Sequence, residues 1–194
     1  NIFTQKNFSK NFLKNYDKVI VCCYSNNNTI LKKLGIKKLQ KIRYELVEKI
    51  IVKLPLKYKN KSYIVLDGNF ACLDPYLGTD FHLLSDVKFS KIEVIKDIFP
   101  KFSHYKKKFI SKGIIKNKKF SNYEDFINNS AKYIPVLRSC KYKGSFFVVR
   151  AISNSKKSKL NDERLSYITK HSKKVISVLA GKWNTSISIS KKLR

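Results

Sequence analysis

The apolar positions predict a buried strand near each end of the sequence. The segments "YDKVIVCCYS", Tyr16–Ser25, and "KVISVLAG", Lys174–Gly181, are short apolar runs that end at turn-forming residues. Their central residues carry few charges on either face, which is typical of strands buried on both sides, as in parallel sheets. We therefore expect both segments to be buried strands.

Four segments between them alternate more regularly between apolar and polar residues. This pattern indicates strands with one face on a core and the other in solvent. The turn pair Asp67-Gly68 divides one segment into the two strands of a hairpin. Antiparallel pairing of chain neighbours is the simplest topology for the four segments, which are Tyr44–Pro55, Ser62–Pro75, Phe81–Ser90 and Gly144–Ser153.

Helical patterns occur in two places. "TILKKLGI" predicts one or two helical turns that stop at Gly35, and Lys91–Tyr133 is Lys-rich and mixed in pattern. At the end of that mixed region, apolar residues between Phe126 and Ile134 have helical spacing, and Pro135 closes the helix. The order along the chain, which is several strands, a helical region and then further strands, predicts an α+β fold with a mainly antiparallel sheet.

Composition indicates a globular protein. Hydrophobic residues make up 43% of 194 residues, and no apolar run reaches the roughly 20 residues that span a bilayer. The sequence contains no Met, so we expect a processed product or a fragment of a longer protein. Neither G-x-G-x-x-G nor G-x-x-x-x-G-K, the glycine-rich phosphate-binding patterns, is present.

The net charge of +29 leaves a nucleic-acid-binding protein as an alternative. Five of the 42 basic residues are Arg, the residue suited to bidentate phosphate and base contacts, and the Lys residues are spread along the whole chain. We therefore favour a solvated basic surface. Non-specific binding to polyanions at low salt is still expected, but no specific nucleic-acid partner.

The four cysteines do not form a metal site or a disulfide framework. They are Cys22, Cys23, Cys72 and Cys140, without C-x-x-C or zinc-type spacing. Cys22 and Cys72 lie within apolar runs, where buried free thiols are common. We therefore expect a reducing, cytoplasmic location and no metal.

The loop that follows the last apolar run has two interpretations. Gly181 allows close approach of a ligand to the backbone, and Lys182 could add a charge. Asn184 and Thr185 are good N-cap residues for a following helix. The alternative is a plain turn that leaves Lys182 and Trp183 at the surface. The next residues, "SISIS", alternate with period two and by themselves predict a strand.

Three further residues are candidates for binding a substrate. Arg150 ends the most apolar segment, and Arg164 follows two acidic residues. Each is either an anion clamp or a local charge partner. His82 lies in an apolar strand, where it is either a core residue or a functional one. No Ser-His-Asp triad and no carboxylate pair of the glycosidase type is recognisable.

The closing segment "KVISVLAGKWNTSISISKKL" resembles that of FAD-dependent oxidoreductases of the D-amino-acid oxidase and glycerol-3-phosphate dehydrogenase superfamily. There a strand ends in Gly-Gly-Lys or Ala-Gly-Lys, followed by a Thr and a helix. "GSFFVVRAIS" and "LNDERLSYI" resemble the family's preceding pair of segments, each with one Arg. "YDKVIVCCYSNNNTILKKLG" is similar to its strand ending in Ala-Thr-Gly followed by a helix. "SYIVLDGNFACLDP" and "FHLLSDV" resemble its substrate-domain strands. The resemblance covers Tyr16–Leu193 in order and is weak over Lys91–Lys132.

The sequence departs from the family in three respects. The N-terminal half with the glycine fingerprint is missing. This chain has Cys23-Tyr24-Ser25 where the family usually has Ala-Thr-Gly. Ala180 replaces the first glycine of the final pair. The resemblance thus implies the C-terminal part of a flavoprotein. Residues 1–40 and 174–194 would be the remnant of a truncated FAD-binding domain that contributes the first and last strands, as neighbours. Residues 41–173 would be the substrate domain.

The resemblance also implies a cofactor and a reaction. FAD would be bound by the loop Gly181, Lys182, Trp183, Asn184 and Thr185, and a helix would follow. A small, anionic amine or alcohol, held by Arg150, Arg164 and His82, would be oxidised by hydride transfer to the flavin; the catalytic residues are unknown. We expect the chain alone to be inactive. The alternatives are a basic nucleic-acid-binding protein and a non-catalytic remnant that needs a separate FAD-domain subunit.

Overall fold

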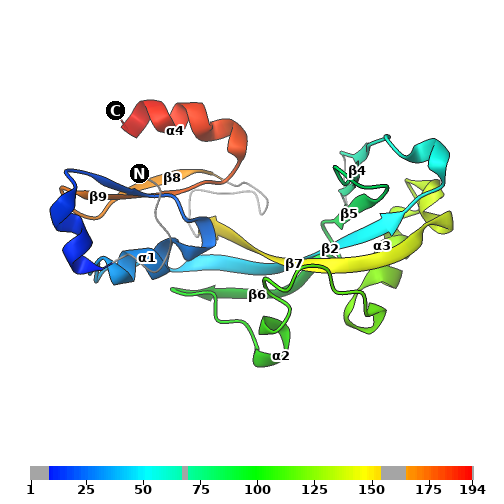
Figure 1. Ribbon diagram of the computed structural model, residues 1–194, viewed down its shortest axis with the longest axis horizontal. Coiled ribbons are helices and arrows are strands. Elements are labelled where there is room, and N and C mark those ends of the chain that lie inside the picture. The colour runs from blue at the N-terminus through cyan, green and yellow to red at the C-terminus, as the bar shows by residue number, and fades with distance from the viewer. Residues whose placement is uncertain (1–8, 67–69, 154–164, 194) are drawn as a thin grey trace. The chain divides into compact units, whose positions relative to one another are not determined.

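The computed structural model describes residues 9–66, 70–153 and 165–193, which divide into two compact units (Figure 1). Unit 1 contains both ends of the chain, Asn1–Tyr44 and Arg150–Arg194, together with Ile95–Lys101. Unit 2 comprises Glu45–Val94 and Phe102–Val149. Both units combine helices and strands, which confirms the predicted α+β class. The predicted domain bounds, 1–40 with 174–194 and 41–173, stay a prediction.

The sheet of unit 1 has the strand order β1-β9-β8, formed by β1 (Val19–Val21), β8 (Tyr167–Lys170) and β9 (Val175–Leu179). β1 and β9 are parallel, with Val19 opposite Val175, and β8 and β9 are antiparallel. The prediction that the first and last apolar segments are neighbouring strands is therefore confirmed.

One part of that prediction is wrong, because β1 is not buried on both faces. The strand is only three residues long, and Ile20 is 43% exposed, whereas all but the last residue of β9 are buried. The physical reason is position: β1 is at the edge of its sheet among the described residues, and β9 is central. Cys22, which follows β1, is accordingly exposed and not buried as expected.

Helix α1 (Asn27–Lys33) covers the core of unit 1. Its apolar residues pack with Val21 of β1 and Val175 of β9. The helix ends where the sequence predicted, because Gly35 takes a left-handed conformation (φ 83°) and the N–H of Ile36 returns to the carbonyl of Leu31. This is the hydrogen bond of a glycine-terminated helix.

Helix α4 (Ser186–Leu193) follows the 3₁₀ turn Trp183–Thr185. The helix implied by the family resemblance is therefore correct, and the strand predicted by the alternation of "SISIS" is wrong. The alternation had no structural cause, because none of the described side chains in α4 is buried.

The main sheet has six strands in the order β3-β4-β5-β2-β6, with β7 also paired to β2. Neighbours β3 and β4, β4 and β5, and β5 and β2 are antiparallel, as predicted. Strand β6 was not predicted. It has no fully buried residue, so the chain shows no clear alternation there. The strands are β2 (Ile42–Lys53), β3 (Tyr63–Val65), β4 (Ala71–Pro75), β5 (His82–Asp86), β6 (Lys91–Asp97) and β7 (Lys141–Ser153).

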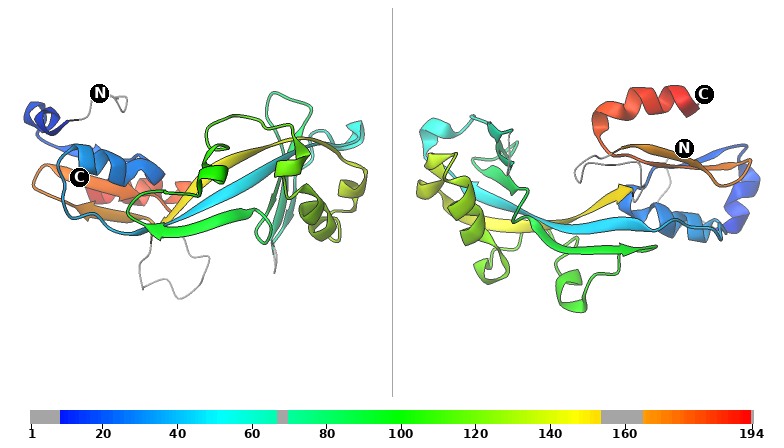
Figure 2. Two further views of the ribbon diagram at one scale, coloured as in Figure 1. Left: turned by 90° about the horizontal axis from the view of Figure 1, so that it is seen from below. Right: turned by 180° about the vertical axis from the view of Figure 1, so that it is seen from behind.

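Helix α3 (Tyr123–Ser130) packs on this sheet and closes the core of unit 2 (Figure 2). Phe126 is fully buried against residues of β2, β4 and β5, such as Ile50 and Leu84. Pro135 begins the 3₁₀ helix Pro135–Ser139, and a single turn, α2 (His104–Lys107), completes the middle region. Among the residues described, no helix has the length and apolar character that crossing a bilayer requires.

Candidate functional site

The loop between β9 and α4 is held in place by one serine. The N–H of Gly181 donates to Ser166 Oγ at 2.9 Å, and Ser166 Oγ lies 2.6 Å from Thr185 Oγ1. Ser166 directly precedes β8, so a residue at the start of β8 holds the loop that follows the neighbouring strand β9. Gly181 is not among the described glycines with a positive φ. An unusual backbone conformation is therefore not the reason for a glycine at this position.

The helical turn that follows the loop begins without a side-chain cap. Its N-cap residue is Lys182, which makes no capping hydrogen bond. The hydroxyl of Thr185 instead donates to the carbonyl of Lys182 at 2.7 Å. N–H groups at such a start carry a partial positive charge and are suited to an anionic or electron-rich group.

The same loop exposes a large apolar surface. Trp183 is 89% exposed, and Lys182 and Asn184 are also exposed. Trp side chains are highly buried on average, so an indole left in solvent is unusual. The loop thus presents a cation and an aromatic face at the start of a helical turn.

Two of the other predicted site residues, Arg150 and His82, belong to different units. Arg150 is half-buried in β7 and belongs to unit 1, as does the loop. Arg164 lies outside the described residues. His82, the first residue of β5, is fully buried in unit 2 between its strand partners Val52 and Pro75. The convergence of Arg150, Arg164 and His82 with the loop stays a prediction.

His82 is chemically unusual in its position. Neither of its ring nitrogens has a hydrogen-bond partner among the described residues, although the side chain is completely buried. Buried polar groups are nearly always paired, because leaving them unpaired costs free energy. In this structure the His82 side chain is fully buried in unit 2.

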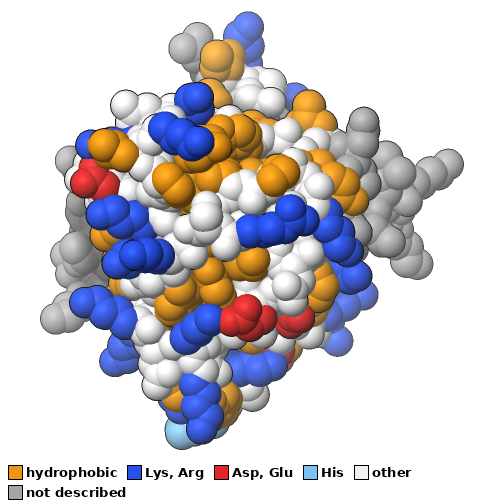
Figure 3. Space-filling model, turned by 90° about the vertical axis from the view of Figure 1, so that its right-hand side faces the viewer, with side chains coloured by type: hydrophobic (Ala, Val, Ile, Leu, Met, Phe, Trp, Pro, Cys, Tyr) orange, Lys and Arg blue, Asp and Glu red, His pale blue; other side chains and the backbone are white. Residues whose placement is uncertain are grey.

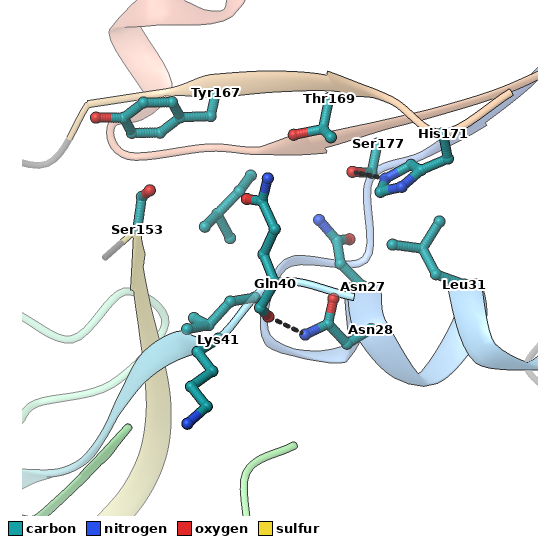
Figure 4. A pocket seen from close by; sticks show the side chains of 12 residues that line it. Asn27, Asn28, Leu31, Gln40, Lys41, Ser153, Tyr167, Thr169, His171 and Ser177 are labelled. Atoms are coloured by element: carbon teal, nitrogen blue, oxygen red, sulfur yellow. Dashed lines mark hydrogen bonds between the residues drawn. The ribbon is translucent and has the colours of Figure 1, made fainter. Parts of the chain in front are cut away.

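The sequence did not predict a polar pocket inside unit 1 (Figure 4). His171 Nε2 and Ser177 Oγ are 2.8 Å apart, on the side of β8 and β9 that faces α1. Burial lowers the pKa of His171, so its imidazole is neutral at neutral pH. Across the pocket, Asn28 donates to the carbonyl of Gln40 at 2.9 Å.

The space that water can enter in this pocket is small. The pocket offers about 30 Å³ of space that water can enter, room for roughly two water molecules. Asn27, which lines it, donates to the carbonyl of Val178 at 2.8 Å and accepts the N–H of Cys23 at 2.6 Å, which ties α1 to β9 and to the turn after β1. The run of three asparagines predicted only a turn, and no signal in the sequence linked it to residues about 150 positions away.

A second, larger cleft lies in unit 2, with about 370 Å³ of space that water can enter. Three lysines, a serine and three apolar residues line it: Lys53, Lys141, Lys143, Ser139, Leu54, Pro55 and Leu56. In the part of the chain that the structure describes, no group of three or more His, Cys, Asp or Glu side chains could hold a metal ion.

Comparison with known proteins gives a structural relationship and no sequence relationship. No family model matches the chain, and no curated protein matches it. The structure resembles that of glycine oxidase from Geobacillus kaustophilus, with a TM-score of 0.50 and 12% sequence identity. The match covers 87% of this chain and 37% of the glycine oxidase chain, so this chain spans well under half of that protein. The fold therefore resembles that of part of this glycine oxidase.

Proposed function

We propose that this chain is part of an FAD-dependent oxidoreductase of the D-amino-acid-oxidase-like type. The observation that carries the proposal is the parallel pair β1–β9, from which the chain passes through Ala180-Gly181 into an uncapped helical turn. The likeness to a glycine oxidase supports the same class. Its reaction would be the oxidation of a small, anionic amine or alcohol.

The loop fits one end of a flavin by the chemistry of its groups. When bound, FAD would accept a hydride from the substrate, which leaves negative charge on the reduced ring. Lys182 and the N–H groups at the start of the helical turn would stabilise that charge. The exposed face of Trp183 offers an apolar surface for an aromatic ring.

Binding of the substrate would fall to the arginines. Arg150 and Arg164 are the residues that could hold an anionic group by charge-assisted hydrogen bonds, each worth on the order of 1.5–3 kcal/mol. His82 is a weaker candidate, since its ring is buried in unit 2.

The test is made on the protein at its natural length. We expect it to purify with FAD, and small anionic amines or alcohols should bleach the flavin absorbance in anaerobic mixing. Lys182→Ala should lower the midpoint potential of the flavin, because the reduced anion loses a neighbouring positive charge. Lys192→Ala, an exposed cation near the far end of α4, is the matched control and should leave the potential unchanged. Absence of flavin, or equal potentials for both variants, would refute the proposal.

A further inference from the structure

The cleft of unit 2 has a chemistry that the proposed function does not use. We propose that it binds a phosphate monoester carried on an apolar group, through Lys53, Lys141 and Lys143. The proposal concerns unit 2 alone and requires no flavin, so it stands or falls independently of the proposed oxidoreductase activity.

Two neighbouring strands bring the three lysines together. Lys53 is the last residue of β2, and Lys141 and Lys143 belong to the first residues of β7, which pairs with β2. Residues two apart on a strand point to the same face, so Lys141 and Lys143 extend in one direction. All three side chains are exposed and line the same cleft.

The positive charge of the cleft is not neutralised by the protein. No carboxylate lines it, and none of the three lysines forms an ion pair among the described residues. The pKa of Asp80 is lowered chiefly by its hydrogen bond and ion pair with Lys59 at 2.6 Å, and Lys53 contributes least. Like charges held close together repel one another, and a bound anion removes that repulsion.

A doubly charged anion suits three ammonium groups better than a single carboxylate does. A phosphate monoester carries about −1.5 to −2 charges at neutral pH and has three acceptor oxygens. Lysine binds phosphate well as a point charge. Ser139 is not needed for this contact, since its hydroxyl already donates to the carbonyl of Val136 at 2.9 Å.

The size and walls of the cleft indicate that the ligand has an apolar part. The space of about 370 Å³ lies in the range of organic-ligand pockets and far exceeds a bare phosphate ion. Leu54, Pro55 and Leu56 form the apolar side, and Leu56 is 79% exposed. Figure 3 shows Lys and Arg side chains lying among exposed apolar ones on the side of the molecule that it draws.

The first experiment measures binding of phenyl phosphate to the full chain by calorimetry and by amide chemical shifts. We expect binding that is tighter than that of inorganic phosphate, with shifts concentrated at residues 53–56 and 139–143. Replacing Lys53, Lys141 and Lys143 together by Gln should weaken binding about tenfold or more. The control replaces three exposed lysines of unit 1, Lys37, Lys38 and Lys192, by Gln and should change binding less than about twofold.

A second experiment identifies the source of the phosphate monoester. Sedimentation with phosphatidylcholine vesicles that contain phosphatidic acid tests a lipid headgroup, and vesicles without phosphatidic acid are the blank. Retention that depends on the three cleft lysines supports the site with a lipid source, and binding of phenyl phosphate alone supports it with a soluble source. The proposal is overturned if neither probe binds, or if the control variant loses as much binding as the cleft variant, since the affinity would then come from overall charge.

Discussion

Strand β5 contains two buried polar side chains, one with many hydrogen bonds and one with none among the described residues. Asp86 is buried, yet its carboxylate accepts four hydrogen bonds: from the N–H groups of Lys88 and Phe89, from Asn129 Nδ2 and from Ser130 Oγ. It thereby joins the turn after β5 to helix α3. His82, at the other end of the strand, has no hydrogen-bond partner among the described residues.

Asp86→Asn should destabilise unit 2 by about 2–3 kcal/mol, because an amide nitrogen would face donors that need an acceptor. Chemical unfolding in urea measures the change. Asp125→Asn is the control: this exposed residue in the first turn of α3 should cost at most about 1 kcal/mol, through its interaction with the helix dipole. Equal losses in the two variants would show that the hydrogen bonds of Asp86 contribute little.

His82→Leu should raise the free energy of unfolding by about 1 kcal/mol. The substitution removes two buried, unpaired nitrogens from an apolar environment and keeps a side chain of similar bulk. The same change at the exposed His104 should shift stability by less than about 0.5 kcal/mol. A marked loss of stability in His82→Leu would mean that the imidazole makes a favourable interaction in the folded protein.

His171 should make the stability of unit 1 depend on pH. Burial lowers its pKa in the folded protein below the ordinary value of 6.5, so the unfolded chain takes up the proton first. The contribution of the neutral His171 to the free energy of unfolding is therefore complete above about pH 6.5 and is lost as the pH falls below that value. Melting temperatures measured between about pH 7.5 and 5.5 should fall less in His171→Gln than in the unchanged protein. If the melting temperatures of the two proteins changed equally with pH, the expectation would be contradicted.

At the scale of elements, burial decides which segments could be predicted. β2, β5 and β7 have buried faces, so their apolar patterns are strong and their positions were predicted from sequence. β6 has no fully buried residue and was missed. The period-two pattern of α4 was misleading because no neighbouring structure buries either face of it.

The candidate site also has one part that could be predicted from the sequence and one part that could not. The loop from Gly181 to Thr185 was predicted, since its residue types are consecutive in the sequence. The contacts that shape it were not. Ser166 holds Gly181 from 15 residues away, and Asn27 reaches Val178 across 151 residues. These contacts depend on how distant segments fold together. The residues next to Ser166 and Asn27 form no sequence pattern that would identify either of them as a partner.

Helix α4 should be the least stable element of unit 1. It has eight residues, no buried side chain and three serines, and isolated helices shorter than about 12–15 residues are marginal in water. Its amides should exchange hydrogen at least about a hundredfold faster than those of β9, four of whose five residues are buried. Exchange followed by mass spectrometry on peptides from the two segments measures this. Equal protection would show that α4 has a stabilising contact in solution.

The molecule as a whole carries a net charge of +29, which favours binding to any polyanion at low salt. Such binding is non-specific and weakens steeply as salt is added. For the flavin loop it is separated by working at high ionic strength, since at 1 M salt exposed charges more than about 3 Å apart are screened. The exposed lysines of the cleft would be screened as well, so for that site the separation comes from the control variant of three lysines in unit 1.

Under those conditions the 194-residue chain alone should not bind FAD tightly. The sequence has no glycine-rich phosphate-binding pattern, and in dinucleotide-binding folds the pyrophosphate lies on such a loop at a helix N-terminus. The loop at Gly181 could contact only the flavin end of the cofactor. FAD, FMN and riboflavin should therefore bind with similar, weak affinities, with dissociation constants above about 1 μM. Equilibrium dialysis of the three compounds against the chain decides the question. Stoichiometric, submicromolar binding of FAD alone would mean that this chain holds the pyrophosphate by residues outside any known glycine pattern.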